Sequence, residues 1–326
     1  MLTETRPLPP PTPSRGTAGV GAPILPVGAW QGERPTPQVR TAPRVVAAVV
    51  AVLAVLGVWL TWRFFVGTVA GQRVDELAFG GAAYGQGRLW RVAEPVLDVV
   101  SVAFVVAGVG VAMLVALVRR RWVLALQVAV LVGGANVTTQ VLKHGVLDRP
   151  ELLPGWTGPN TLPSGHTTVA ASVSVALLLV TPRAWRPVVA ILGAAYTAAT
   201  GVSTLVGQWH RPSDVVAALL VVLAWGAAVC ALTPASSTDE LRRPGGTFAT
   251  PGSYVVAGLL LASLVGVLVS GGTLVGLVTN GDPIPLSPDL TAYAAGAVGV
   301  LAVTAAVFAA LLVLRQLTAQ PAATSG

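Results

Sequence analysis

The sequence predicts an all-α integral membrane protein with about eight transmembrane spans, of which six form a core and two are added at the C-terminal end. Of its 326 residues, 54% are apolar and only 10% are charged, whereas soluble domains carry roughly 25% charged residues. The apolar residues gather into runs of about 20, the length needed to cross a hydrocarbon core of ~30 Å. A helix satisfies its own backbone hydrogen bonds in lipid, so we expect each run to be helical.

The expected elements follow one another as a tail, a core, a loop and two further helices. Residues 1–43 contain ten prolines and no sustained apolar periodicity, which predicts a disordered cytoplasmic tail. Residues 44–233 predict the six-span core, 234–253 a cytoplasmic loop, 254–316 two additional transmembrane helices and 317–326 a C-terminal tail. The expected spans cover residues 45–66, 99–118, 122–142, 165–182, 187–207, 214–233, 254–278 and 290–314. The Gly-rich segment 67–94, with mixed charges, is expected at the membrane interface.

Basic residues indicate the orientation and the class of partner. The triplet Arg119–Arg121 favours a cytoplasmic side between the second and third spans, which places both termini of this multi-pass cell-membrane protein in the cytoplasm. The net charge of +7 is scattered over helix ends, so nucleic-acid binding is not expected. Cys230, the single cysteine, falls in an apolar run and excludes an intramolecular disulfide or a thiolate metal site.

Three polar segments interrupt the apolar pattern, and the eight-span arrangement places all three on the external face. They are KHGVLDRP at 143–150, PSGH at 163–166 and STLVGQWHRPSD at 203–214. Together they hold all three histidines of the chain. Ionisable groups are costly at membrane depth, so their clustering indicates a functional site.

The residue types suit the binding of a phosphate group. Arg149 offers a planar fork and Lys143 a point charge. A helix that begins at Ser164 adds free backbone amides near Gly165, with the helix dipole behind them.

The histidines suit acid–base and nucleophilic chemistry. Asp214 follows His210 at i+4 and can accept a hydrogen bond from one ring nitrogen, which leaves the other nitrogen free for attack on phosphorus. His166 comes from another helix and can protonate the leaving group. Taken singly, these residues are more often interfacial cations or structural hydrogen-bonding pairs. Their order and their common face favour a site.

The three segments resemble the signature motifs of the type 2 phosphatidic acid phosphatase superfamily, written KxxxxxxRP, PSGH and SRxxxxxHxxxD. The resemblance implies a metal-independent phosphatase without a cofactor. It assigns phosphate binding to Lys143, Arg149, Ser164 and Gly165, general acid catalysis to His166, the phosphohistidine to His210 and its orientation to Asp214.

The sequence departs from this pattern at two points. Five residues instead of six separate Lys143 from Arg149, and Thr204 stands where the family has an arginine. Arg211 is the candidate cation that compensates for the missing one.

The predicted function is hydrolysis of a lipid phosphomonoester or pyrophosphate, of the polyprenyl diphosphate or phosphatidate type, at the external face. The expected partner is therefore a membrane lipid phosphate. Two alternatives remain open: a lipid phosphotransferase, and a catalytically inactive protein that binds lipid headgroups.

Overall fold

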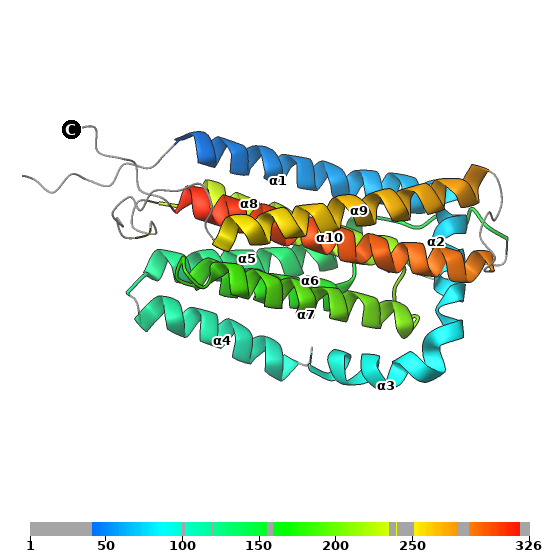
Figure 1. Ribbon diagram of the computed structural model, residues 1–326, viewed down its shortest axis with the longest axis horizontal. Coiled ribbons are helices and arrows are strands. Elements are labelled where there is room, and N and C mark those ends of the chain that lie inside the picture. Colours follow the sequence, from blue (N-terminus) through cyan, green and yellow to red (C-terminus); the bar gives the residue numbers. More distant parts are fainter. Residues whose placement is uncertain are drawn as a thin grey trace, which may run out of the picture. The chain divides into compact units, whose positions relative to one another are not determined.

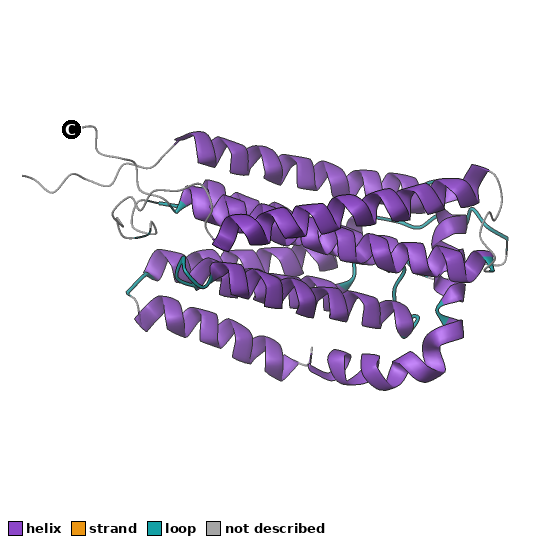
Figure 2. Ribbon diagram, in the orientation of Figure 1, coloured by secondary structure: helices purple, strands orange, loops and turns teal. Residues whose placement is uncertain are grey.

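The computed structural model of the chain describes residues 41–99, 102–118, 120–154, 159–234, 239, 251–279 and 287–319. Every regular element within these ranges is helical, as Figures 1 and 2 show. The predicted all-α class is therefore confirmed. The expected tail falls outside the described residues except for its last three positions, where α1 already begins at Thr41.

The described helices coincide with the predicted apolar runs, and two more occupy the segment expected at the interface. The helices are α1 (Thr41–Thr61), α2 (Val69–Gly81), α3 (Ala83–Val99), α4 (Val102–Val118), α5 (Trp122–Val141), α6 (Gly165–Val180), α7 (Arg186–Val206), α8 (Pro212–Ala231), α9 (Pro251–Thr279) and α10 (Pro288–Thr318). Short π-helical turns, η1 (Trp62–Val66) and η2 (Leu142–Val146), extend α1 and α5. The sequence had predicted no helix for α2 or for most of α3.

Length and composition support a multi-pass membrane protein. In the described part of the chain, six helices are long and apolar enough to cross a bilayer, and the apolar helices Ala107–Val118 and Gly165–Val180 are shorter. These two coincide with the remaining predicted spans, so the total of eight spans stays a prediction. The outer face of α1 exposes large apolar side chains such as Val52 and Leu53, which suits contact with lipid rather than with water.

Helix α6 lies at the centre of the bundle and carries the start of the candidate site. It packs against α4, α5, α7, α8 and α10. Half of its 16 residues are Gly, Ala, Ser or Thr, and 12 of the 16 are buried, which allows this close approach. Thr139 of α5 shares a hydrogen bond of 2.9 Å with Thr168, and Asn136 donates one of 3.2 Å to Ser172. These bonds fix the first turns of α6 against α5.

Helix α2 runs across the ends of the longer helices, as Figure 1 shows. The Thr68 hydroxyl caps it by accepting a 3.0 Å hydrogen bond from the Gly71 amide. A Cβ at Gly71 would lie 2.1 Å from the backbone oxygen of Phe64, so this close approach requires glycine. The buried Gln72 amide donates a 2.7 Å hydrogen bond to the carbonyl of Pro150. These contacts hold α2 against the polar segment that follows α5.

Helices α9 and α10 belong to the same bundle as the helices around the site. α9 packs along α10, and α10 in turn contacts α2, α7 and α8. The buried Arg315 of α10 donates from its Nε to the carbonyl oxygen of Leu179 at 3.1 Å. The last helix is thereby joined to the end of α6 remote from His166.

Candidate active site

His210 lies in the turn between α7 and α8. Its backbone amide donates a 3.3 Å hydrogen bond to the carbonyl of Thr204, and the backbone then enters α8 at Pro212. The ring nitrogen Nδ1 of His210 lies 3.1 Å from Oδ2 of Asp214, one helical turn further on. This is the i,i+4 pair that the sequence predicted. It leaves Nε2 as the ring nitrogen directed away from the carboxylate.

Asp214 connects the segment of His210 with the segment that leads to His166. Its side chain is fully buried, and besides His210 its Oδ2 accepts hydrogen bonds from the Thr161 hydroxyl at 2.7 Å and from the Arg211 amide at 3.0 Å. Its backbone carbonyl accepts a 2.9 Å hydrogen bond from the Ser164 amide. The orientation of His210 and the start of α6 are thus set by one residue.

The N-terminus of α6 forms as predicted. Ser164 is the N-cap, and its hydroxyl accepts a 3.4 Å hydrogen bond from the Thr167 amide. A Cβ at Gly165 would meet only the Gln140 amide nitrogen, at 3.9 Å, so there is open space beside this turn. Free amides and the helix dipole at such a terminus attract anions.

His166 lies in the first turn of α6 and is half-buried. Its ring centroid is 5.3 Å from that of Trp209, the residue before His210. The structure therefore brings the first turn of α6 next to the turn that carries His210.

Two of the predicted cations differ in their surroundings. The side chain of Arg149 is 2% exposed, and its Nη2 lies 3.9 Å from Oδ2 of Asp75. Burial, together with the nearby positive charge of Arg211, lowers the pKa of Arg149. Lys143 is half-buried in the π-helical turn η2, so the shortened first motif begins in an irregular turn. Among the described residues, no three His, Cys, Asp or Glu side chains are placed to hold a metal ion.

Thr204 supplies no charge where the family motif has an arginine. It is fully buried, and its hydroxyl donates a 2.7 Å hydrogen bond to the Gly201 carbonyl of the same helix. Arg211 is also buried, but its Nη2 donates to Oε2 of Glu76 at 2.7 Å, and its guanidinium lies 4.7 Å from the centre of the Phe79 ring. Arg211 is thus directed toward α2 while its charge reaches Arg149.

Sequence reasoning missed the acidic residues of α2. Asp75 accepts hydrogen bonds from the amide and the hydroxyl of Ser213 and approaches Arg149, while Glu76 binds Arg211. A signal was present, because Asp75 shares one helical face with Val74 and Ala78, and a carboxylate on a buried face demands a partner. The partner could not be read from the sequence.

Helix α3 approaches the site from another side. The ring centroid of Trp90 lies 5.8 Å from that of Trp209, and a Cβ at Gly207 would come within 2.8 Å of the Trp90 ring. Trp62 donates a 2.9 Å hydrogen bond to the Asp148 carbonyl, beside Arg149.

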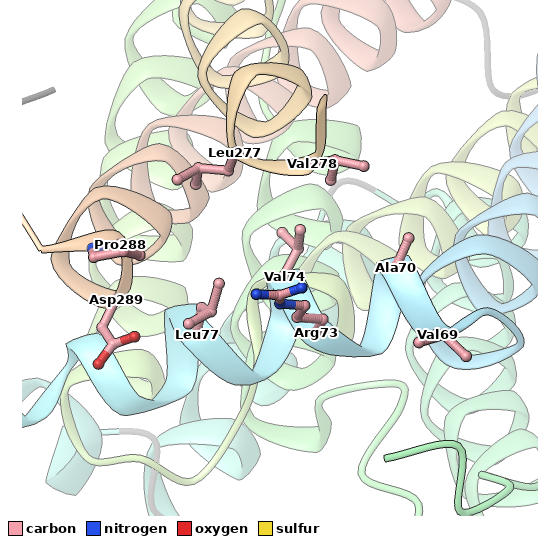
Figure 3. A pocket seen from close by; sticks show the side chains of 9 residues that line it. All are labelled: Val69, Ala70, Arg73, Val74, Leu77, Leu277, Val278, Pro288 and Asp289. Atoms are coloured by element: carbon pink, nitrogen blue, oxygen red, sulfur yellow. The ribbon is translucent and has the colours of Figure 1, made fainter. Parts of the chain in front are cut away.

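A separate cavity lies beside α2, away from the histidines. It has a volume of about 490 Å³ and is bounded by α2 and by the neighbouring ends of α9 and α10. Figure 3 shows Arg73 in it between Val74 and Leu77, with Leu277 and Val278 across from them. None of the predicted site residues lines it, so the candidate site is defined by its side chains and not by this cavity.

Residues 103–237 match the model of the PAP2 superfamily. No curated protein and no solved structure matches the chain. The matched range runs from α4 to just beyond α8 and includes all three polar segments. Members of this superfamily are phosphatases that act on phosphate esters, often those of lipids. This match confirms, over residues 103–237, the resemblance to the superfamily that the three motifs predicted.

Proposed function

We propose that the protein hydrolyses the phosphomonoester or pyrophosphate group of a membrane lipid through a phosphohistidine on His210, at the external face of the cell membrane. The observation that carries the proposal is the contact between Nδ1 of His210 and Oδ2 of the buried Asp214. A carboxylate in this position holds the imidazole in one tautomer and favours its protonated form during attack.

In the first step, Nε2 of His210 attacks phosphorus and forms a P–N bond, while the bond from phosphorus to the leaving oxygen breaks. His166 donates a proton to that oxygen as it leaves. Arg149, Lys143 and the amides at the start of α6 stabilise the charge on the transferred group. Asp214 stabilises the positive charge that develops on the His210 ring.

In the second step, His166 now acts as a base and removes a proton from water. The water oxygen attacks phosphorus, the P–N bond breaks, and phosphate leaves with His210 restored. The close approach of His166 to Trp209, and of His210 to Asp214, supports this division of roles. Each group returns to its starting protonation state.

A lipid substrate is favoured because the site lies at the ends of helices apolar enough to cross a bilayer. A lipid whose tail remains among neighbouring lipids can present its phosphate there without leaving the membrane. Polyprenyl diphosphate and phosphatidate are the two substrate types to compare. The positive-inside bias of the sequence favours an external position for this end of the bundle.

The test measures phosphate release by the purified full-length protein in detergent with both lipid types. We expect His210→Ala to abolish release, while His144→Ala, the matched change of an exposed histidine near Lys143, should leave it intact. Brief exposure to ³²P-labelled substrate should leave an acid-labile, base-stable label on the wild type and none on His210→Ala. Full turnover by His210→Ala would exclude the phosphohistidine.

Assays on the same purified protein distinguish the two alternative functions, phosphotransfer and headgroup binding without catalysis. Phosphoryl transfer to an added lipid alcohol in preference to water would identify a phosphotransferase. Binding of both lipid types without release of phosphate from either would identify an inactive headgroup-binding protein.

A further inference from the structure

Asp75 lies between the phosphate-binding region and the start of α8. Its Oδ2 accepts a hydrogen bond from the Ser213 hydroxyl, its Oδ1 accepts one of 3.4 Å from the Ser213 amide, and Nη2 of Arg149 lies 3.9 Å from Oδ2. Asp75 is 1% exposed. It therefore contacts a predicted phosphate-binding cation without belonging to any of the three motifs.

The other side of Asp75 faces an apolar space. Asp75 and Ser213 line a cavity of about 220 Å³ between α2, α8, α9 and α10, whose remaining lining is apolar except for Ser270. The helices α9 and α10 therefore offer no charge to Asp75 there. The charges that act on it are those of Arg149, from the segment after α5, and of Arg211 and Asp214, from the start of α8.

Arg149 needs an anion when the site holds no substrate. A guanidinium with a side-chain exposure of 2% has lost most of its hydration, and a buried charge without a counter-charge is strongly disfavoured. Arg211 adds a second positive charge nearby, although Glu76 binds that one. Asp75 is placed to neutralise Arg149.

We propose that Asp75 is the resident counter-ion of Arg149 and competes with the phosphate of the substrate for this guanidinium, so that Asp75 limits the affinity of the site for phosphate. The inference rests on the proposed phosphate site. A bound phosphate dianion repels the Asp75 carboxylate, because both face one cation. Binding of phosphate therefore raises the protonated fraction of Asp75 at a pH near its pKa, and the fraction falls again when phosphate leaves.

The protonation behaviour of Asp75 suits this exchange. Burial, followed by the negative charge of Asp214, raises the pKa of Asp75 to about 7, against the opposing effects of Ser213 and the two arginines. Below this pKa the carboxyl is neutral and does not compete, so phosphate binds most tightly. Above it the carboxylate is ionised and competes. Affinity for phosphate should therefore fall as the pH rises through neutrality.

The test measures binding of ³²P-labelled inorganic phosphate to the full-length protein in detergent, for wild type and Asp75→Asn. The asparagine can still accept a hydrogen bond from Ser213 but carries no charge. If bound phosphate raises the Asp75 pKa by about one unit, Asp75→Asn should bind about fivefold more tightly near pH ~8 and about equally near pH ~6. Titration of phosphate itself is common to both proteins and cancels in the ratio. Glu151→Gln, which neutralises an exposed acid two residues from Arg149, should match wild type.

Two further variants test the route of the effect. In an Arg149→Gln background, Asp75→Asn should no longer change phosphate affinity, because the shared cation is gone. Ser213→Ala removes a hydrogen bond that lowers the Asp75 pKa, so it should move the pH dependence of wild-type binding to higher pH. This second variant tests the inference even if Asp75→Asn fails to fold.

The inference would be overturned if Asp75→Asn bound phosphate more weakly than wild type. It would also be overturned if the ratio of the two phosphate affinities did not vary with pH. An unchanged pH dependence in Ser213→Ala would do the same, as would a wild type that binds no phosphate. Phosphate binding with the expected Asp75 effect but without turnover of any lipid would instead exclude only the proposed function.

Discussion

Asp214→Asn tests how far catalysis depends on the carboxylate behind His210. Three donors converge on Oδ2 of Asp214, namely the Thr161 hydroxyl, the Arg211 amide and His210 Nδ1. An asparagine whose carbonyl oxygen takes this position can accept the same hydrogen bonds. The geometry should survive, while the negative charge that stabilises a protonated imidazole is lost.

The magnitude follows from the two oxygens of the carboxylate. Oδ1 is buried and has no hydrogen-bond partner among the described residues, so an asparagine NH₂ there would lose its hydrogen bonds to water. This should cost about 1–3 kcal/mol of folding stability. The turnover number should fall by roughly 10²–10⁴-fold, or about 3–5 kcal/mol in the barrier, because activation of the histidine contributes on that scale.

The assay combines phosphate release at saturating lipid with thermal unfolding of the same detergent preparations. Asp148→Asn is the control, since it makes the same change at an exposed acid in the neighbouring polar segment. A near-wild-type turnover number in folded Asp214→Asn would refute the role of the carboxylate. A complete loss of folding would instead show that the Asp214 carboxylate is mainly a structural link to Thr161, and Asp214→Glu would then be measured.

Arg211→Ala should lower the turnover number at saturating lipid far more than the control Arg183→Ala, which changes an exposed arginine just before α7. If Arg211→Ala changed only the apparent affinity for lipid, Arg211 would not compensate for the arginine that Thr204 replaces. Cysteines introduced at the exposed positions 151 and 183, in a Cys230→Ala background, test the orientation with an impermeant thiol reagent on intact cells. We expect labelling of the cysteine at 151 and protection of the cysteine at 183. The reverse pattern would place the site in the cytoplasm. Gly71→Ala should lower the unfolding temperature and the activity, because its Cβ would lie 2.1 Å from the Phe64 oxygen. The control Gly80→Ala on the same helix has no atom within 4 Å of its Cβ, so it should be neutral or stabilising by about 1 kcal/mol. Equal unfolding temperatures of the two variants would contradict the close packing of α2.

The sequence by itself determined the helical class and the local geometry at the starts of α6 and α8. Apolar runs of membrane length leave the helix as the only open structure that satisfies the backbone. The cap at Ser164, the proline at the start of α8 and the i,i+4 spacing of His210 and Asp214 are local features, and the structure has each of them. Local spacing sufficed because residues three or four positions apart at the start of a helix lie close to one another.

Only the tertiary structure decided which charges face one another. Arg149 meets Asp75 from a helix more than 60 residues earlier, and Arg211 turns toward Glu76 of that helix. The sequence predicted merely an interfacial segment there, because the mixed charges and glycines of α2 indicate surface exposure when its partners are unknown. A buried carboxylate is stable only beside a cation or hydrogen-bond donors that the fold supplies. Such pairs join residues far apart in the sequence, so they depend on how the helices pack and not on the spacing within one helix.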